Sequence, residues 1–255
     1  WSCSTPGTGA WSSTTRCTCC RRRSSSSPPT SRPAAAFASV LDDTAALRLV
    51  RRRGQAMAEA SAVTATGMAA LLGGDPEVTL AHLEKLGLTP ANVNGAGQIV
   101  AAGTLEQIDA LVADKPEGVR RVVPLKVAGA FHTAHMAPAV SELEAAAKGL
   151  DPADPVVPYV SNRDGARVAT GTQVLERLVG QVANPVRWDL CMETFQELGA
   201  TALLEVCPGG TLTGLAKRAM PGVKTLALKT PDDLDAARAL IAEHSPAAPA
   251  DPQTA

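Results

Sequence analysis

His132 is the histidine in this sequence that is best placed to act as a general base. The apolar run 122–127 is expected to form a strand, and His132 follows its C-terminal end by a few residues. Loops at strand ends often carry catalytic groups, and histidine titrates near neutral pH. A lone loop histidine is nevertheless more often structural, and His135 is expected to be an early residue of the next helix.

A run of three arginines on an expected helix offers an anion-binding side chain. The helix has an apolar face formed by four residues at helical spacing: Leu47, Val50, Gly54 and Met57. Residues 51–53 are all arginine, and three consecutive helical positions span roughly 200° of the helix wheel, so at least one should turn towards the protein. Arg53 precedes Gly54, where the missing side chain is expected to permit close packing. A partly buried arginine can bind a carboxylate through two hydrogen bonds, although charge runs are usually solvated.

The first 36 residues differ in composition from the rest of the chain. They contain no Leu, Ile, Val, Met, Asp, Glu or Lys, and they are rich in Ser, Thr, Arg, Pro and Cys. Such a segment cannot bury enough apolar surface to offset its conformational entropy. The bias is also typical of a GC-rich gene translated in the wrong frame. We therefore expect residues 1–39 to be disordered or mis-framed, and the chain to be a fragment.

Composition excludes several classes of protein. No apolar run approaches the ~20 residues of a membrane-spanning helix. A net charge of −1 and 3% aromatic residues argue against a nucleic-acid-binding protein. The arginine run 21–23 lacks the apolar segment of a secretory signal, and Cys191 and Cys207 suit reduced core thiols, so we expect a cytoplasmic protein without a metal site.

From residue 40 onward the sequence predicts an α/β protein. Residues 61–127 have the order βαββαβ, which indicates a ferredoxin-like subdomain. After them, strands alternate with helices, which favours a mostly parallel sheet covered on both faces. Strands are expected near 68–72, 92–94, 98–102, 121–127, 156–160, 202–206 and 223–228. Helices are expected near 76–86, 105–113, 136–147, 173–182, 186–198, 212–219 and 234–242. The core should comprise 40–60 and 128–245, followed by a disordered tail at 246–255.

Five stretches occur together in an order that carries a specific resemblance. They are LVRRRGQAM (49–57), NVNGAGQIVAAG (92–103), GAFHT (129–133), NPVRW (184–188) and EVCPGGTLTGL (205–215). Over about residues 40–245 the chain resembles the bacterial malonyl-CoA:acyl carrier protein transacylases, in their actinobacterial form. The resemblance implies an α/β-hydrolase-like core, incomplete at its N-terminus, with the ferredoxin-like subdomain inserted in it.

The resemblance also implies a reaction of fatty acid or polyketide synthesis. A serine takes malonyl from coenzyme A and passes it to the phosphopantetheine thiol of the acyl carrier protein, in a ping-pong transfer without a cofactor. His132 would be the base, and a backbone carbonyl in the stretch from Gln181 to Asn184 would orient its ring. Arg53 would bind the free carboxylate of malonyl, and Phe131 would narrow the pocket. The partners would be the carrier protein and malonyl-CoA, with no nucleic acid or membrane and a monomeric chain when complete.

Two amides in the second stretch have a less specific implied role. Asn92 and Asn94 would line the pocket loosely, and a structural role for their side chains is an equal alternative.

One part of the family's pattern is missing from the sequence. The family's serine lies in a G-H-S-x-G turn between a strand and a helix, which would fall between about Ser24 and Arg32. That region reads SSSSPPTSR, with neither the turn nor a preceding strand. The PGTG at 6–9 echoes a family PGQG signature, with Thr8 in place of glutamine, and is taken as chance. The alternative to an enzyme is therefore a non-catalytic remnant that at most binds carrier protein or coenzyme A.

Overall fold

The computed structural model describes residues 31–206 and 209–244, which form a mixed α/β structure. The expectations for the 1–30 segment, including the absent serine turn, lie outside the described residues. The same holds for Cys207 and the tail. Within the described ranges, no helix is long and apolar enough to cross a membrane.

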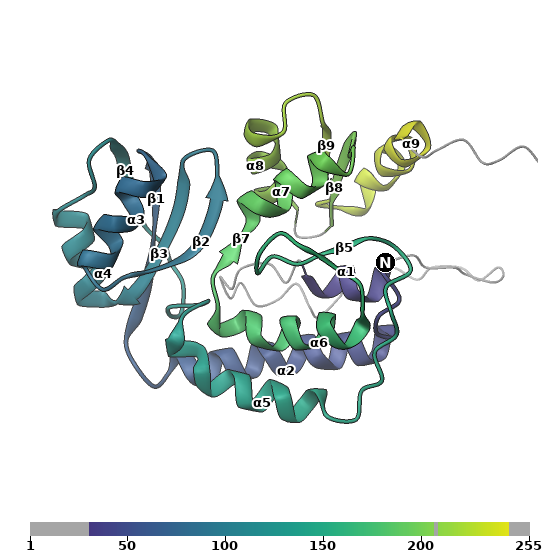
Figure 1. The fold of residues 1–255 in the computed structure, drawn as a ribbon, viewed down its shortest axis with the longest axis horizontal. Coiled ribbons are helices and arrows are strands. Elements are labelled where there is room, and N and C mark those ends of the chain that lie inside the picture. Colours follow the sequence, from purple (N-terminus) through teal and green to yellow (C-terminus); the bar gives the residue numbers. More distant parts are fainter. Residues whose placement is uncertain (1–30, 207–208, 245–255) are drawn as a thin grey trace, which may run out of the picture.

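A five-stranded sheet forms one lobe of the molecule (Figure 1). Its first four strands and two helices follow the expected order βαββαβ: β1 (Thr66–Gly73), α3 (Pro76–Lys85), β2 (Thr89–Gly95), β3 (Gln98–Thr104), α4 (Leu105–Ala113) and β4 (Val119–Pro124). Their spatial order is β4-β1-β3-β2, and each neighbouring pair is antiparallel. A short fifth strand, β7 (Val186–Arg187), pairs in parallel with β2 and joins this lobe to the rest of the molecule.

Local sequence signals explain where the two helices of this lobe begin. The Asp75 side chain accepts hydrogen bonds from the backbone N–H groups of Glu77 and Val78 at the start of α3. Thr104 and Gln107 form a reciprocal capping box at the start of α4. Both caps satisfy N–H groups that have no partner within the helix itself.

Both faces of the sheet are covered, so β1 is buried along most of its length. Ala69 and Leu71 point into a cluster with α3 and α4, whereas Met68 and Ala70 point into the larger core cluster, which also contains Met57 and Phe131. This placement explains why the strand is continuously apolar rather than alternating with polar residues.

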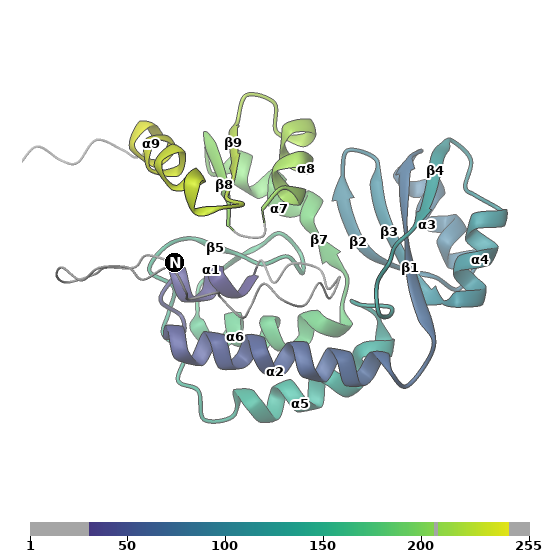
Figure 2. The ribbon, with the colours of Figure 1, turned by 180° about the vertical axis from the view of Figure 1, so that it is seen from behind.

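Three helices lie side by side and form a helical layer next to the sheet lobe (Figures 1 and 2). They are α2 (Asp43–Ser61), α5 (Ala137–Ala147) and α6 (Gly171–Gly180), with the short α1 (Ser31–Phe37) beside them. Arg52 on α2 forms an ion pair with Glu142 on α5.

The buried face of α2 differs from the expected one. It comprises Ala46, Leu49, Arg53, Ala56, Met57 and Ala60. Leu47 is 48% exposed, and a Cβ added at Gly54 would meet nothing within 4 Å, so the expected close packing at Gly54 is wrong. Arg53 is buried because its own position points inward, not because its neighbour is small.

The remaining elements lie between and above these layers. They are η2 (Ala134–Met136), β5 (Tyr159–Val160), β6 (Arg167–Val168), η3 (Gln181–Ala183), α7 (Trp188–Glu197), β8 (Ala202–Glu205), α8 (Thr211–Ala219), β9 (Lys224–Ala227), η4 (Pro231–Asp233) and α9 (Leu234–His244). His135 lies in η2, as expected. The helix expected over 186–198 begins only at Trp188, after the strand β7.

The described residues do not form the expected mostly parallel sheet. Parallel pairing is confined to β2 with β7 and to β8 with β9, and the other pairs are antiparallel. The alternation of strands and helices predicted the elements but not their partners, because strand direction depends on contacts distant in the sequence.

Candidate active site

His132 is held in a strained backbone conformation next to the core. Its φ angle is 63°, in the left-handed region that residues other than glycine seldom adopt. The residue is 1% exposed, and its backbone N–H donates to the carbonyl of Val182 at 3.1 Å. Such strain persists only where surrounding contacts enforce it, and it concentrates at functional sites.

Hydrogen bonds hold the backbone on both sides of His132 in the sequence. The N–H of Ala130 donates to Thr66 Oγ1 at 2.9 Å, and the hydroxyl of Thr133 donates to the Ala130 carbonyl at 2.7 Å. A Cβ at Gly129 would lie 2.9 Å from Ser61 Oγ, so only glycine permits the chain to pass there. The position of His132 is therefore set by β1 and the end of α2 as well as by its own loop.

The ring of His132 contacts the backbone of η3. Its Nδ1 lies 3.0 Å from the carbonyl oxygen of Gln181, and both residues are buried. Asn184, the other end of the expected stretch, directs its side chain elsewhere and donates to the Gly180 carbonyl at 2.7 Å. The structure therefore brings Gln181, and not Asn184, to the histidine.

Arg53 reaches the same place from α2. Its Nη2 donates to Oε1 of Gln181 at 2.8 Å, and the residue is 6% exposed. Burial lowers the pKa of Arg53 to about 10, so the side chain stays charged at neutral pH. Within 31–206 and 209–244 no carboxylate forms an ion pair with it, and its Nε is buried without a hydrogen-bond partner. A buried cation in this state is suited to an anionic ligand.

The side chain of Gln181 lies between the arginine and the histidine. Its Nε2 is 3.2 Å from Nδ1 of His132, while its Oε1 accepts the hydrogen bond from Arg53. Sequence reasoning named only the backbone of this residue, because a glutamine after a helix has no signal that distinguishes it from a surface amide.

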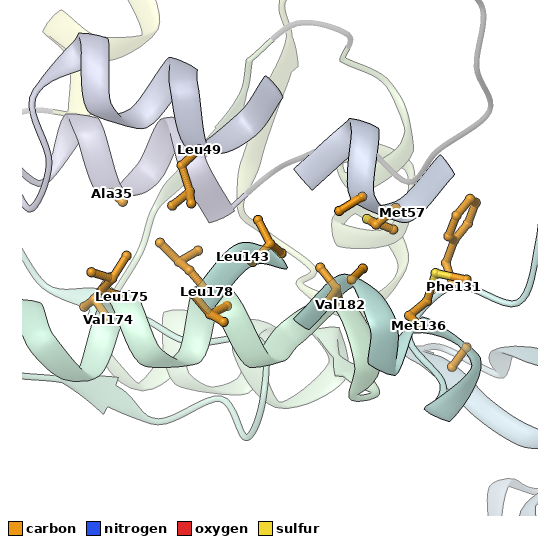
Figure 3. Packing of buried hydrophobic residues seen from close by; sticks show 14 of the residues in the cluster. Ala35, Leu49, Met57, Phe131, Met136, Leu143, Val174, Leu175, Leu178 and Val182 are labelled. Carbon is orange, nitrogen blue, oxygen red and sulfur yellow. The ribbon is translucent and has the colours of Figure 1, made fainter. Parts of the chain in front are cut away.

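Phe131, the expected pocket residue, is part of the main core cluster. Phe131 is 3% exposed, and Figure 3 shows it at the same end of the core cluster as Met57, Met136 and Val182. Phe131 directly precedes His132 in the sequence, and its ring belongs to the main core cluster.

The two expected pocket amides lie on β2. Asn92 pairs with Val100 of β3, and paired residues share a sheet face; Val100 belongs to the same core cluster as Phe131. In the described part of the chain, Arg53 and Gln181 bond to each other and Gln181 contacts His132, whereas Asn92 and Asn94 lie on β2. The structure thus places Asn92 on the face of the sheet that packs against the core containing Phe131.

A cavity of about 470 Å³ lies beside α5 and α6, and Gln181 and Asn184 contribute to its wall. Arg53, His132 and Phe131 do not line it. Of the polar cluster of Arg53, Gln181 and His132, only Gln181 lines the cavity.

A buried carboxylate organises the loop that follows β8. Glu205 is 4% exposed and accepts hydrogen bonds from the backbone N–H groups of Gly210, Leu212 and Thr213 at 2.7, 3.0 and 2.9 Å. Burial acts to raise the pKa of Glu205, but these N–H donors outweigh it and lower the pKa below its usual value. The side chain therefore caps the N-terminal end of α8.

No group of three or more His, Cys, Asp or Glu residues suited to a metal ion occurs in the described ranges. Cys191 is buried and unpaired to any other cysteine, and burial raises the pKa of its thiol to about 12. It is therefore a protonated core residue rather than a nucleophile.

Comparisons with known proteins connect this geometry to a family. Residues 33–233 match the family described as "Acyl transferase domain". Malonyl CoA-acyl carrier protein transacylase of Mycobacterium tuberculosis is 48% identical over 202 residues, covering 79% of this chain and 67% of the relative. The transacylase of Escherichia coli is 35% identical, covering 80% and 68% of the two chains. This chain belongs to the malonyl-CoA:acyl carrier protein transacylases.

Solved transacylase structures share the fold as well as the sequence. The Mycobacterium tuberculosis enzyme has a TM-score of 0.77 at 48% identity, covering 81% of this chain and 68% of that one. A malonyl-transacylase in complex with a type II polyketide acyl carrier protein has a TM-score of 0.74 at 33% identity, covering 81% and 69%. The matched transacylase region contains Arg53, His132 and Gln181, and the chain spans about two thirds of the length of these relatives.

Proposed function

We propose that this chain carries the malonyl-binding and proton-transfer part of a transacylase site. The observation that supports this most strongly is the buried Arg53, charged and without an acidic partner in the described ranges, joined through Gln181 to His132. The carboxylate of a malonyl thioester would supply the missing counter-charge. The arginine would thereby select malonyl over acyl groups that lack a carboxylate.

The proposed reaction needs two thioester exchanges. A serine Oγ attacks the malonyl thioester carbon, a C–O bond forms and the C–S bond breaks. His132 Nε2 takes the serine proton and gives it to the departing coenzyme A thiolate. The carrier protein's thiol then attacks the ester, with His132 accepting its proton and returning it to the serine. The Gln181 carbonyl would hold the Nδ1–H tautomer, the role that a carboxylate plays in many serine enzymes.

The proposed domain boundaries are those expected from the sequence. Residues 61–127 would be a ferredoxin-like subdomain, since their βαββαβ order and β4-β1-β3-β2 arrangement are those of that fold. Residues 40–60 and 128–245 would be the α/β-hydrolase-like core, with 1–39 and 246–255 outside it. We also propose a cytoplasmic protein that needs no resident cofactor.

The carrier protein is the proposed macromolecular partner. The solved complex of a related malonyl-transacylase with a type II polyketide acyl carrier protein supports this assignment, at 33% identity to this chain. Phe131 would limit the space beside the α-carbon, and Asn92 and Asn94 would be looser pocket residues.

A chimera tests the assignment of Arg53. Residues 1–39 would be replaced by the N-terminal segment of the Mycobacterium tuberculosis relative, which supplies the serine. Arg53→Ala should lower kcat/KM for malonyl-CoA by about 10²-fold and leave acetyl-CoA unchanged or improved. Arg51→Ala, an exposed arginine on the same helix, is the matched control and should change neither. Equal losses for malonyl-CoA and acetyl-CoA would show that Arg53 is structural.

A further inference from the structure

Three polar side chains from distant parts of the chain meet inside the protein at Gln181. Arg53 Nη2 lies 2.8 Å from Gln181 Oε1, and Gln181 Nε2 lies 3.2 Å from His132 Nδ1. Arg53, His132 and Gln181 are 6%, 1% and 8% exposed, so these contacts are shielded from solvent. The amide is thus in direct contact with both the proposed carboxylate-binding group and the proposed base.

The arginine fixes which end of the amide faces the histidine. A guanidinium group has only donors, so the atom of Gln181 that receives its hydrogen bond must be the oxygen. The NH₂ end of the same amide then points at His132 Nδ1. Rotation of the amide by 180° would place two donors against each other at Arg53, which is unfavourable.

Nδ1 of His132 therefore has two competing partners at Gln181. The backbone carbonyl, at 3.0 Å, can only accept, and it requires a proton on Nδ1. The side-chain NH₂, at 3.2 Å, can only donate, and it requires an unprotonated Nδ1. A single Nδ1 cannot satisfy both partners at once. In a neutral imidazole the first bond leaves the lone pair on Nε2, whereas the second places the proton on Nε2.

We propose that Gln181 is a positioning residue that couples occupancy of Arg53 to the tautomer of His132, an inference that rests on the proposed function. While Arg53 donates to Oε1, the amide NH₂ competes for Nδ1 and opposes the tautomer that can act as a base. When a substrate carboxylate takes the donors of Arg53, the amide is released. Its oxygen can then turn towards Nδ1–H, which adds a second acceptor for that proton. The imidazole stays neutral, because one proton leaves Nε2 as one is gained at Nδ1.

The consequence is a base that is favoured only by an acyl group with a carboxylate. The carboxylate of a malonyl thioester would both bind Arg53 and shift the tautomer of His132. An acetyl thioester would fill the same space and leave the Arg53–Gln181 hydrogen bond in place. Discrimination would then arise in the chemical step as well as in binding.

The test is a nitrogen NMR experiment on the full chain with ¹⁵N-labelled histidine. The sequence has four histidines, so single His→Gln substitutions of the other three assign His132. Long-range ¹H–¹⁵N spectra are recorded for the free protein, for the protein with saturating malonyl-CoA and for the protein with saturating acetyl-CoA. We expect malonyl-CoA to move Nδ1 of His132 towards the protonated form, and acetyl-CoA to leave it where it is in the free protein. Malonyl-CoA that binds through Arg53 without changing the tautomer would overturn the coupling.

Two variants separate the amide from the backbone carbonyl. Gln181→Met keeps the carbonyl and removes the NH₂ group, so His132 should hold the Nδ1–H form with or without malonyl-CoA. Arg53→Ala releases the amide without a ligand and should have the same effect. A ligand-dependent shift that survives in Gln181→Met would show that the side chain is not the link. If Gln181→Met fails to fold, the comparison of the two thioesters on the unaltered chain decides the matter.

The same titrations distinguish this inference from the proposed function. Binding of malonyl-CoA that is no tighter than that of acetyl-CoA, and is unaffected by Arg53→Ala, would overturn the carboxylate site itself. Tighter, Arg53-dependent binding with an unchanged His132 tautomer would leave the proposed function standing and remove the coupling alone.

Discussion

Arg53 and Gln181 are 128 residues apart in sequence and joined by a buried hydrogen bond of 2.8 Å. The bond crosses from α2 to η3. Neither residue has a carboxylate partner in the described ranges, and Nε of the buried guanidinium has no hydrogen-bond partner there. A buried cation without a carboxylate partner in the described ranges favours binding of an anion.

The chain as written should form no covalent malonyl-enzyme. The sequence contains no G-H-S-x-G, and a serine without a rigid turn and oxyanion donors is an ordinary alcohol. Intact-protein mass spectrometry after incubation with malonyl-CoA should show an unchanged mass. A malonyl increment would contradict this expectation, and peptide mapping would identify the residue that accepted it. A malonyl increment would also exclude the alternative that the chain is a non-catalytic remnant.

Phe131→Ser should admit a bulkier acyl group in the chimera. Phe131 is buried and is the residue proposed to limit the space beside the α-carbon, so removing its ring should enlarge that space; one methyl group is worth about 1 to 3 kcal/mol in such a pocket. The ratio of kcat/KM for methylmalonyl-CoA to that for malonyl-CoA should rise by about 10-fold or more. Phe131→Leu keeps an apolar side chain and is the control. If Phe131→Ser leaves the ratio of kcat/KM for methylmalonyl-CoA to that for malonyl-CoA unchanged, residues other than Phe131 determine the selectivity against the methyl group.

Glu205→Gln should destabilise the protein at neutral pH. Glutamine offers one acceptor and two donors to three backbone N–H groups, so we expect a loss of about 2 kcal/mol in the free energy of unfolding. Urea unfolding monitored by circular dichroism measures it. Glu197→Gln, on an exposed face, should change stability by no more than about 0.5 kcal/mol.

The effect of Glu205 should also depend on pH in a defined direction. Its pKa is lower in the folded protein than the usual 4.5, so its stabilising effect is complete above that value. The effect is lost as the pH falls through the lower, folded pKa. The stability difference between the unaltered chain and Glu205→Gln should therefore narrow below about pH 4.5. A difference that is constant from pH 7 to pH 3 would contradict the assignment.

The segment 61–127 should fold without the rest of the chain. The core cluster between the sheet and the helices α3 and α4 consists only of residues of this segment, from Ala69 to Val119, with Val122 packed against them. Circular dichroism and urea titration of the isolated segment should show a cooperative transition. Leu71→Ala, at a fully buried position, should lower its stability by about 2 to 5 kcal/mol. A non-cooperative transition would mean that the segment needs the helical layer in order to fold.

The sequence predicted the elements of this segment better than the details of the site. Leu105–Ala113 was predicted at its observed bounds because Thr104 and the apolar spacing define the helix locally. The phase of α2 was misjudged because Leu47 and Val50 suggest one face, while packing against α5 buries Leu49 and Arg53 instead. Two-residue strands such as β7 carry too few side chains to form a pattern.

The parts of the site were predictable to different degrees. His132 follows a strand, and the family resemblance implied that a backbone carbonyl in the stretch from Gln181 to Asn184 orients its ring; in the structure the Gln181 carbonyl lies 3.0 Å from Nδ1. The roles of these residues stay predictions. The contact of the Gln181 side chain with Arg53 was not predictable, because it depends on how α2 and η3 pack and not on any local pattern.

The most direct test of the account is the affinity of the full chain for malonyl-CoA compared with acetyl-CoA, measured by isothermal titration calorimetry. If Arg53 binds the malonyl carboxylate, malonyl-CoA should bind more tightly than acetyl-CoA. Arg53→Ala should then weaken malonyl-CoA binding by about 10- to 150-fold, the equivalent of about 1.4 to 3 kcal/mol, and should not weaken acetyl-CoA binding. Equal affinities for the two thioesters, or equal losses in Arg53→Ala, would contradict the assignment of this buried cluster as a malonyl-binding site.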